Sequence, residues 1–250
     1  MPDTTVEIRR PALALLGTEP WRAALEYVSH KRGLDVTARP ADGHPVVLYP
    51  GLGSSGLALK PLRKHCKSLG YNAIDWGRGF NTGPRGELDT WLAALAEHTQ
   101  RLLGPRRQSV TLLGWSLGGL YAREVAKLLG PRVRQVITIG TPFNADADHT
   151  NVGWVFRLLN GARPVFDQAI SDRLRTAPAV PTTSIYSRSD GVVAWQTCTH
   201  RESADHTEDI EVSSSHLGMG WNPAVLAVVA DRLAQRPGCW RPYSGRPAPA

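Results

Sequence analysis

Several features that mark particular classes of protein are scarce or missing in this 250-residue chain. It has three cysteines, Cys66, Cys198 and Cys239, too few for a disulfide framework and without the spacing of a metal site. No apolar run approaches the roughly 18 residues that a membrane-spanning helix needs. The short run at 12–16 has no cleavage site after it, so no secretory signal is expected. These absences predict a cytoplasmic protein with reduced thiols and no membrane span, a Cys198–Cys239 disulfide being the alternative.

The charge is strongly one-sided, with a formal net charge of +7 and an isoelectric point near 9.7. Such a balance raises the hypothesis of a nucleic-acid partner. The arginines are scattered, however, and only Arg9–Arg10 and Arg106–Arg107 form Arg–Arg pairs. No signature of a nucleic-acid-binding fold is present. We therefore expect no nucleic-acid partner.

The body of the chain reads as an α/β domain over residues 44–236. Hydrophobic residues make up 42% of the sequence, enough for a substantial core. Short apolar runs alternate with helical patterns, which is typical of a mostly parallel sheet with helices on both faces. Residues 1–43 are predicted to be a helical extension packed on this domain, with a helix at 20–31, and residues 237–250 a loose Pro/Gly/Arg-rich tail. The expected strands are 44–50, 71–76, 109–115, 133–140, 182–187 and 210–215, and the expected helices are 56–68, 87–103, 117–129 and 222–235.

A long insertion at about 143–180 interrupts this alternation. Val152, Val155, Phe156 and Leu159 recur with the period of an amphipathic helix. A second stretch places Phe166, Ile170 and Leu174 on one face. We expect a short helical cap over the edge of the sheet, in which Val155, Phe156 and Leu159 contact substrate. A helical excursion that only packs is the alternative.

The strongest motif is G-x-S-x-G at 114–118, between a buried strand and a helix. A serine hydroxyl is a poor nucleophile unless a base activates it. A tight strand-to-helix turn holds the hydroxyl of Ser116 out of the backbone, and Gly114 and Gly118 remove side chains that would collide in that turn. The helix N-terminus then directs free N–H groups at the reacting oxygen. The motif predicts Ser116 as a nucleophile.

A general base and its orienting acid are predicted further along the chain. His216 follows the last expected strand, at an edge where loops gather, and His149 is the only rival considered. Asp190 ends the preceding strand, and its rivals are Asp146 and Asp148. The order Ser116, Asp190, His216 is the order expected of this architecture. Asp190 alternatively only caps its Asp–Gly turn.

Two backbone N–H groups are predicted to form an oxyanion hole. One is that of Leu117, directly after the nucleophile. The other is that of Leu52, in the PGLGSS loop after the first strand, where Gly51 and Gly53 let the backbone approach the substrate. A plain glycine turn is the alternative for this loop.

Taken together, these motifs resemble the α/β-hydrolase superfamily, and in particular its small bacterial serine esterases and lipases. The resemblance covers about residues 44–236 and includes one departure, a PGLG loop where the family commonly has a His-Gly loop. It implies hydrolysis of a small-molecule acyl ester through a Ser116 acyl-enzyme, with no metal or organic cofactor. Short to medium acyl chains are expected. The alternatives are an acyltransferase with the same triad, an amidase or thioesterase, and a non-catalytic hydrolase-like binding protein. The resemblance rests on PGLGSS, LGYNAIDWGRGFNTGP, GWSLGGLYAR, GTPF, YSRSDGVV and SSHLGMGWNP.

Overall fold

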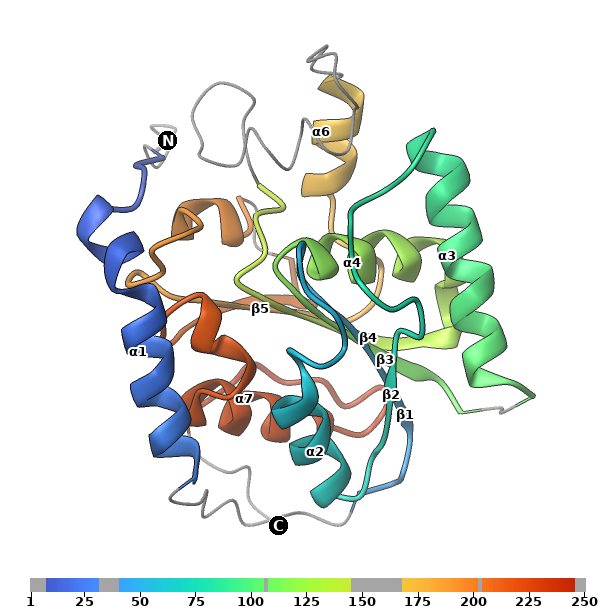
Figure 1. Ribbon diagram of the computed structural model, residues 1–250. Helices are drawn as coiled ribbons and strands as arrows, with labels where there is room; N and C mark the ends of the chain where they lie inside the picture. Colours follow the sequence, from blue (N-terminus) through green and yellow to red (C-terminus); the bar gives the residue numbers. More distant parts are fainter. Residues whose placement is uncertain (1–7, 32–40, 106–107, 145–167, 202–203, 246–250) are drawn as a thin grey trace.

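Six strands form one sheet in which every neighbouring pair is parallel, as expected for an α/β-hydrolase fold. The computed structural model describes residues 8–31, 41–105, 108–144, 168–201 and 204–245. The strand order is β2-β1-β3-β4-β5-β6 (Figure 1). The strands are β1 (Pro45–Tyr49), β2 (Asn72–Asp75), β3 (Val110–Trp115), β4 (Val133–Ile139), β5 (Thr182–Tyr186) and β6 (Thr207–Glu211).

Helices cover both faces of this sheet. One face packs against α3 and α4, which share a core cluster with Val47, Tyr49 and Leu112. The other face packs against α2 and α7, with Val46, Leu48 and Leu113 pointing to that side. The strands therefore carry apolar residues on both faces and read as continuous runs in the sequence. The helices are α1 (Leu13–Lys31), α2 (Lys60–Ser68), α3 (Leu88–Leu103), α4 (Leu117–Leu129), α6 (Gln168–Arg175) and α7 (Pro223–Leu233).

Three boundaries differ from the sequence-based expectation. β6 lies at 207–211 and not at 210–215, because an edge strand pairs along one side only and can carry the polar Thr207 and Glu208. α2 begins at Lys60 and not near 56, since residues 56–59 form turns and Pro61 occupies the first helical turn. α1 begins at Leu13 and contains Pro20 in its interior.

The expected cap falls mostly outside the described residues. Val152, Val155, Phe156, Leu159 and Phe166 are among these, so their role stays a prediction. The last part of the insertion forms α6, where Leu174 is buried and packs with Ile170 against the core cluster beside α4.

The described part of the C-terminal tail is not loose. The backbone N–H of Tyr243 donates a hydrogen bond to Glu208 at 2.7 Å, and the Arg232 side chain donates to the carbonyl of Arg241 at 2.8 Å. Tyr243 also packs against the core cluster under α7. Within the described ranges, no helix is long and apolar enough to cross a membrane.

Candidate active site

The strand order places two loops at one point of the sheet edge. After β1 the chain moves outward to β2 and then returns to the other side of β1 to form β3. The carboxyl ends of β1 and β3 therefore flank the crevice where such sheets bind ligands. The loop containing Gly51 and Leu52 leaves β1, and Ser116 leaves β3. A side chain placed at Gly51 would lie 3.2 Å from Cβ of Ser116, so the two loops touch.

Ser116 occupies the strained turn that the G-x-S-x-G motif predicts. Its φ of 54° and ψ of −125° make it the only non-glycine residue with positive φ in the described ranges. Such a backbone conformation costs about 1–3 kcal/mol, which the surrounding contacts must offset. A Cβ at Gly114 would lie 2.2 Å from the Gly118 carbonyl oxygen, and one at Gly118 would lie 2.2 Å from that of Tyr49. The turn therefore requires both glycines.

The backbone around Ser116 is fixed by Ile139, at the end of β4, and by Thr141, two residues later. Its N–H donates to the Ile139 carbonyl at 2.8 Å, and its own carbonyl accepts from the Thr141 hydroxyl at 3.0 Å. Ser116 is also the N-cap residue of α4, so the unpaired N–H groups of the first helical turn lie beside it. The partial positive charge of this helix end favours a developing oxyanion.

His216 and Asp190 form a buried hydrogen-bonded pair. Nδ1 of His216 lies 2.6 Å from Oδ2 of Asp190. The other carboxylate oxygen, Oδ1, accepts from the backbone N–H groups of Val192 at 2.8 Å and Val193 at 2.7 Å. With Nδ1 engaged, Nε2 is the ring nitrogen left for another partner. This is the arrangement of a general base and its orienting acid.

His216 lies close to the elbow. The ring centroids of His216 and Trp115, the residue before Ser116, are 5.5 Å apart, and the indole Nε1 donates to the His216 carbonyl at 3.2 Å. A Cβ at Gly140, the residue after β4, would lie 3.1 Å from Nδ1 of His216. Gly140 has a φ of +55°, so glycine both permits this turn and leaves room for the imidazole.

The electrostatic surroundings of His216 favour its protonated form. Burial lowers the pKa of His216, but the charge of Asp190, the hydrogen bond from it and the charge of Glu19 all raise it, and the net shift is upward. An imidazole with raised proton affinity is a stronger base once it is neutral.

The loop that carries Leu52 is braced by Asn81, a fully buried residue. The Asn81 amide donates to the Pro50 carbonyl at 2.8 Å, and its backbone carbonyl accepts from the Gly53 N–H at 2.9 Å. Its side-chain oxygen accepts from the Tyr121 hydroxyl at 3.2 Å. Within the described ranges, no backbone hydrogen bond is recorded from the N–H of Leu52 or Leu117. The role of these two groups as an oxyanion hole stays a prediction.

The sequence comparison agrees with this architecture. Residues 46–249 match the sequence profile described as the Alpha/beta hydrolase family. The chain belongs to the alpha/beta hydrolase family. No curated protein matches the sequence significantly.

Several solved structures share the fold at low sequence identity. Lipase B of Aspergillus fumigatus superposes with a TM-score of 0.59 at 16% identity, over 84% of this chain and 58% of that one. A lipase-esterase related protein of Clostridium acetobutylicum gives 0.54 at 16% identity, over 78% and 96%. A thioesterase domain of the curacin biosynthetic pathway gives 0.52 at 16% identity, over 79% and 93%. At these identities the likeness concerns the fold.

The other histidines of this alpha/beta hydrolase lie elsewhere or have structural partners. His44 precedes β1, at the opposite edge of the sheet, and contacts Asp42 and Thr111. His149 and the rival acids Asp146 and Asp148 lie outside the described residues. The side chain of His200 is buried among polar partners. Its side chain is 6% exposed, with Nδ1 2.7 Å from Asp209 and Nε2 3.1 Å from the buried Arg123, whose guanidinium needs polar neighbours.

Two polar residues at this site were not expected from the sequence. Asn81 lies in a loop rich in glycine between β2 and α3. Glu19 lies in the N-terminal extension, which carries no recognisable motif, and yet its carboxylate contacts the backbone of His216. A lone acid or amide has no spacing signal, so only the folded chain identifies these residues.

A separate groove of about 790 Å³ lies between α1 and α2. Its walls are mainly apolar and include Trp115, Leu217 and Trp221, with Lys60 and Lys64 also among its lining. None of the side chains of Ser116, Asp190, His216 or Leu52 lines it. It nevertheless borders the candidate site, because Trp115 directly precedes Ser116 and Leu217 directly follows His216. In the described ranges, no cluster of three or more metal-ligating side chains occurs.

Proposed function

We propose that this alpha/beta hydrolase cleaves carboxylic esters with a Ser116–His216–Asp190 triad. The observation that carries the proposal is the 2.6 Å contact between His216 and Asp190, beside an elbow that holds Ser116 at a φ of 54°. The proposed nucleophile, base and acid follow three different strands, and His216 contacts both Asp190 and Trp115, the residue before Ser116. Two structural neighbours, a lipase and a lipase-esterase related protein, support an ester as the substrate.

In the proposed reaction, Nε2 of His216 accepts the proton of the Ser116 hydroxyl as its oxygen attacks the ester carbonyl. The carbonyl π electrons move to oxygen and form a tetrahedral oxyanion, which accepts hydrogen bonds from the N–H groups of Leu52 and Leu117. His216 then protonates the departing alcohol, leaving an acyl-enzyme. Water attacks this ester in turn, with His216 again as the base, and the acid is released. Asp190 holds Nδ1–H of His216 throughout, so that Nε2 faces the serine.

A panel of p-nitrophenyl esters from acetate to palmitate tests the reaction class. We expect turnover that declines for the longest chains and stoichiometric inactivation by a serine-directed phosphonate, with the added mass on the peptide that contains Ser116. A fully folded protein that neither hydrolyses the panel nor takes up the phosphonate contradicts the proposed function.

The pH profile of kcat/KM should carry the signature of His216. The base must be neutral, so activity falls as His216 becomes protonated. Because the net effect of its surroundings is to raise its pKa, we expect the acid limb to have its midpoint above the ordinary imidazole value of about 6.5. The profile is measured with an activated ester in buffers of constant ionic strength. A midpoint well below 6.5 contradicts an assignment of the limb to this histidine.

Acyl-chain preference should depend on the predicted cap, at Val155, Phe156 and Leu159. Phe156→Ala is expected to shift the preference toward longer or bulkier acyl groups, because each buried methylene contributes about 0.8 kcal/mol in the enlarged site. Leu159→Ala should act in the same direction. The control is Ala58→Phe, which narrows the α1–α2 groove and should leave the profile unchanged. A shift in the control alone would place the acyl chain in that groove.

A further inference from the structure

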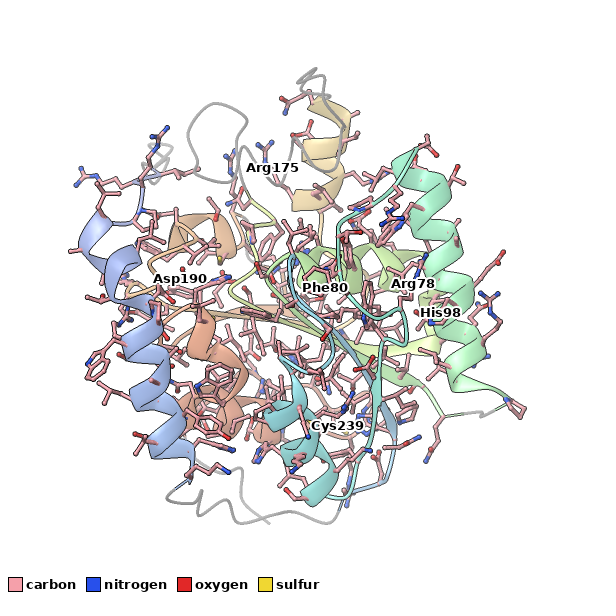
Figure 2. The ribbon with its side chains drawn as sticks, in the orientation of Figure 1. Arg78, Phe80, His98, Arg175, Asp190 and Cys239 are labelled. Carbon is pink, nitrogen blue, oxygen red and sulfur yellow. The ribbon has the colours of Figure 1, made fainter. Side chains whose placement is uncertain are left out.

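Helix α1 lies against the body of the protein in an unusual orientation. Surface helices ordinarily bury an apolar stripe and expose their charges. In α1 the side chains of Trp21 and Leu25 are 72% and 55% exposed, whereas Glu19 is 2% exposed. Burial of apolar surface therefore does not explain how this helix is held. In Figures 1 and 2, α1 runs along one side of the molecule, with Asp190 labelled close beside it.

The carboxylate of Glu19 joins the two loops that carry Asp190 and His216. Oε1 accepts from the N–H of Gly191 at 2.8 Å and from that of His216 at 3.0 Å. Oε2 accepts from the N–H of Leu217 at 3.0 Å. Gly191 directly follows Asp190, so one buried side chain fixes the backbone beside both members of the pair. Hydrogen bonds to a carboxylate are stronger than those between neutral groups, and more so away from water.

The packing leaves little freedom for α1 to shift. A Cβ at Gly191 would lie 2.5 Å from the Leu15 carbonyl carbon, and one at Gly218 would lie 1.9 Å from Oε2 of Glu26. The Asp190 loop and the His216 loop thus touch the helix through glycines. This close approach lets Glu19 reach the backbone of both.

We propose that Glu19 is a positioning residue of the triad, holding the Asp190 and His216 loops in the register that catalysis needs. The inference rests on the proposed function, in which His216 is the base. Glu19 touches no reacting atom and acts through His216. Its charge also adds to that of Asp190 in raising the pKa of His216 against the opposing effect of burial.

The other charged groups around His216 provide a matched control. Arg22 lies 3.5 Å from Oε1 of Glu19. Glu26, two helical turns after Glu19, accepts from the Ser214 hydroxyl at 2.9 Å and the Ser215 N–H at 2.7 Å. It therefore fastens the same loop to the same helix, without contacting His216 or the Asp190 loop. Both glutamates should contribute to stability, and only Glu19 should act on the base.

The test compares Glu19→Gln, Glu19→Asp and Glu26→Gln with the wild type, using kcat, KM and the acid limb of kcat/KM. Glu19→Gln keeps the size of the side chain but loses its charge and presents an amide N–H₂ to backbone donors. We expect kcat to fall by about 10- to 100-fold, since small misplacements of catalytic groups have effects of this size, with KM little changed. The midpoint of its acid limb should move to lower pH, because a negative charge near His216 is lost.

Glu19→Asp keeps the charge and is one methylene too short to reach both loops. In this variant kcat should fall, but the acid limb of kcat/KM should stay near its wild-type position. Glu26→Gln should lower the melting temperature while retaining most of kcat and an unshifted acid limb. If Glu19→Gln does not fold, Glu19→Asp decides, because wild-type kcat in that folded variant overturns the proposal. A folded Glu19→Gln variant that retains most of kcat and has an unshifted acid limb, as expected for Glu26→Gln, also overturns the proposal.

Phosphonate labelling separates this inference from the proposed function. If the wild type is labelled at Ser116 and Glu19→Gln has unchanged kcat and pH profile, only the positioning role of Glu19 is refuted. If the folded wild type is neither labelled nor active, the proposed function itself is refuted.

Discussion

Replacing Ser116 with alanine is expected to abolish ester hydrolysis while leaving the fold intact. Loss of a triad member typically lowers turnover by several orders of magnitude, because the acyl-enzyme can no longer form. Alanine also carries a Cβ, so the strained backbone at a φ of 54° is retained and the change removes only the hydroxyl. Turnover of p-nitrophenyl butyrate and the thermal melting curve should be measured on the same preparation.

Two further variants make this result specific. Ser116→Gly also removes the hydroxyl but relieves the positive φ, and should be more stable than Ser116→Ala by about 1 kcal/mol or more. Ser68→Ala, on the exposed end of α2, should match the wild type in turnover. If folded Ser116→Ala retains more than about a tenth of wild-type turnover, Ser116 is not the nucleophile, since even a single acid–base group is worth about 10²-fold.

Most strands of this fold could be predicted because they are buried on both faces. Val46 to Tyr49 and Val110 to Trp115 are predominantly apolar runs that are buried throughout, and the structure places strands there with shifts of at most a residue or two. β6 was misplaced for the converse reason. As an edge strand it carries a single apolar residue, Ile210, among four polar ones, while the more regular run at 210–215 continues beyond its end.

The predicted triad residues had local signals, and the residues that support them had none. Ser116 stands in a motif, and Asp190 and His216 each follow an expected strand. Glu19 and Asn81 act through backbone groups that are distant in sequence, 172 residues away for the Glu19–Gly191 contact. A backbone N–H is present at nearly every position, so the sequence does not indicate which one a buried carboxylate will meet.

Replacing Asp190 with asparagine should lower kcat on the order of 10⁴-fold, as expected when the acid of a triad loses its charge. The geometry explains why the amide cannot substitute. Oδ1 of Asp190 accepts from the N–H groups of Val192 and Val193, so the asparagine side chain should keep its carbonyl oxygen on these two donors. Its N–H₂ group then faces Nδ1 of His216, which must become an acceptor. The ring proton moves to Nε2, and the base can no longer take the proton of Ser116.

The chain offers a matched control for this change in Asp209→Asn. Asp209 pairs with Nδ1 of His200 at 2.7 Å, much as Asp190 pairs with His216 at 2.6 Å, but His200 contacts Arg123 and not the elbow. Asp209→Asn should therefore retain turnover even if it lowers the melting temperature. Asp146→Asn and Asp148→Asn test the rival acids and should also remain active. If Asp146→Asn or Asp148→Asn loses activity while folded Asp190→Asn keeps it, the acid of the triad follows β4, and the His216–Asp190 pair is structural.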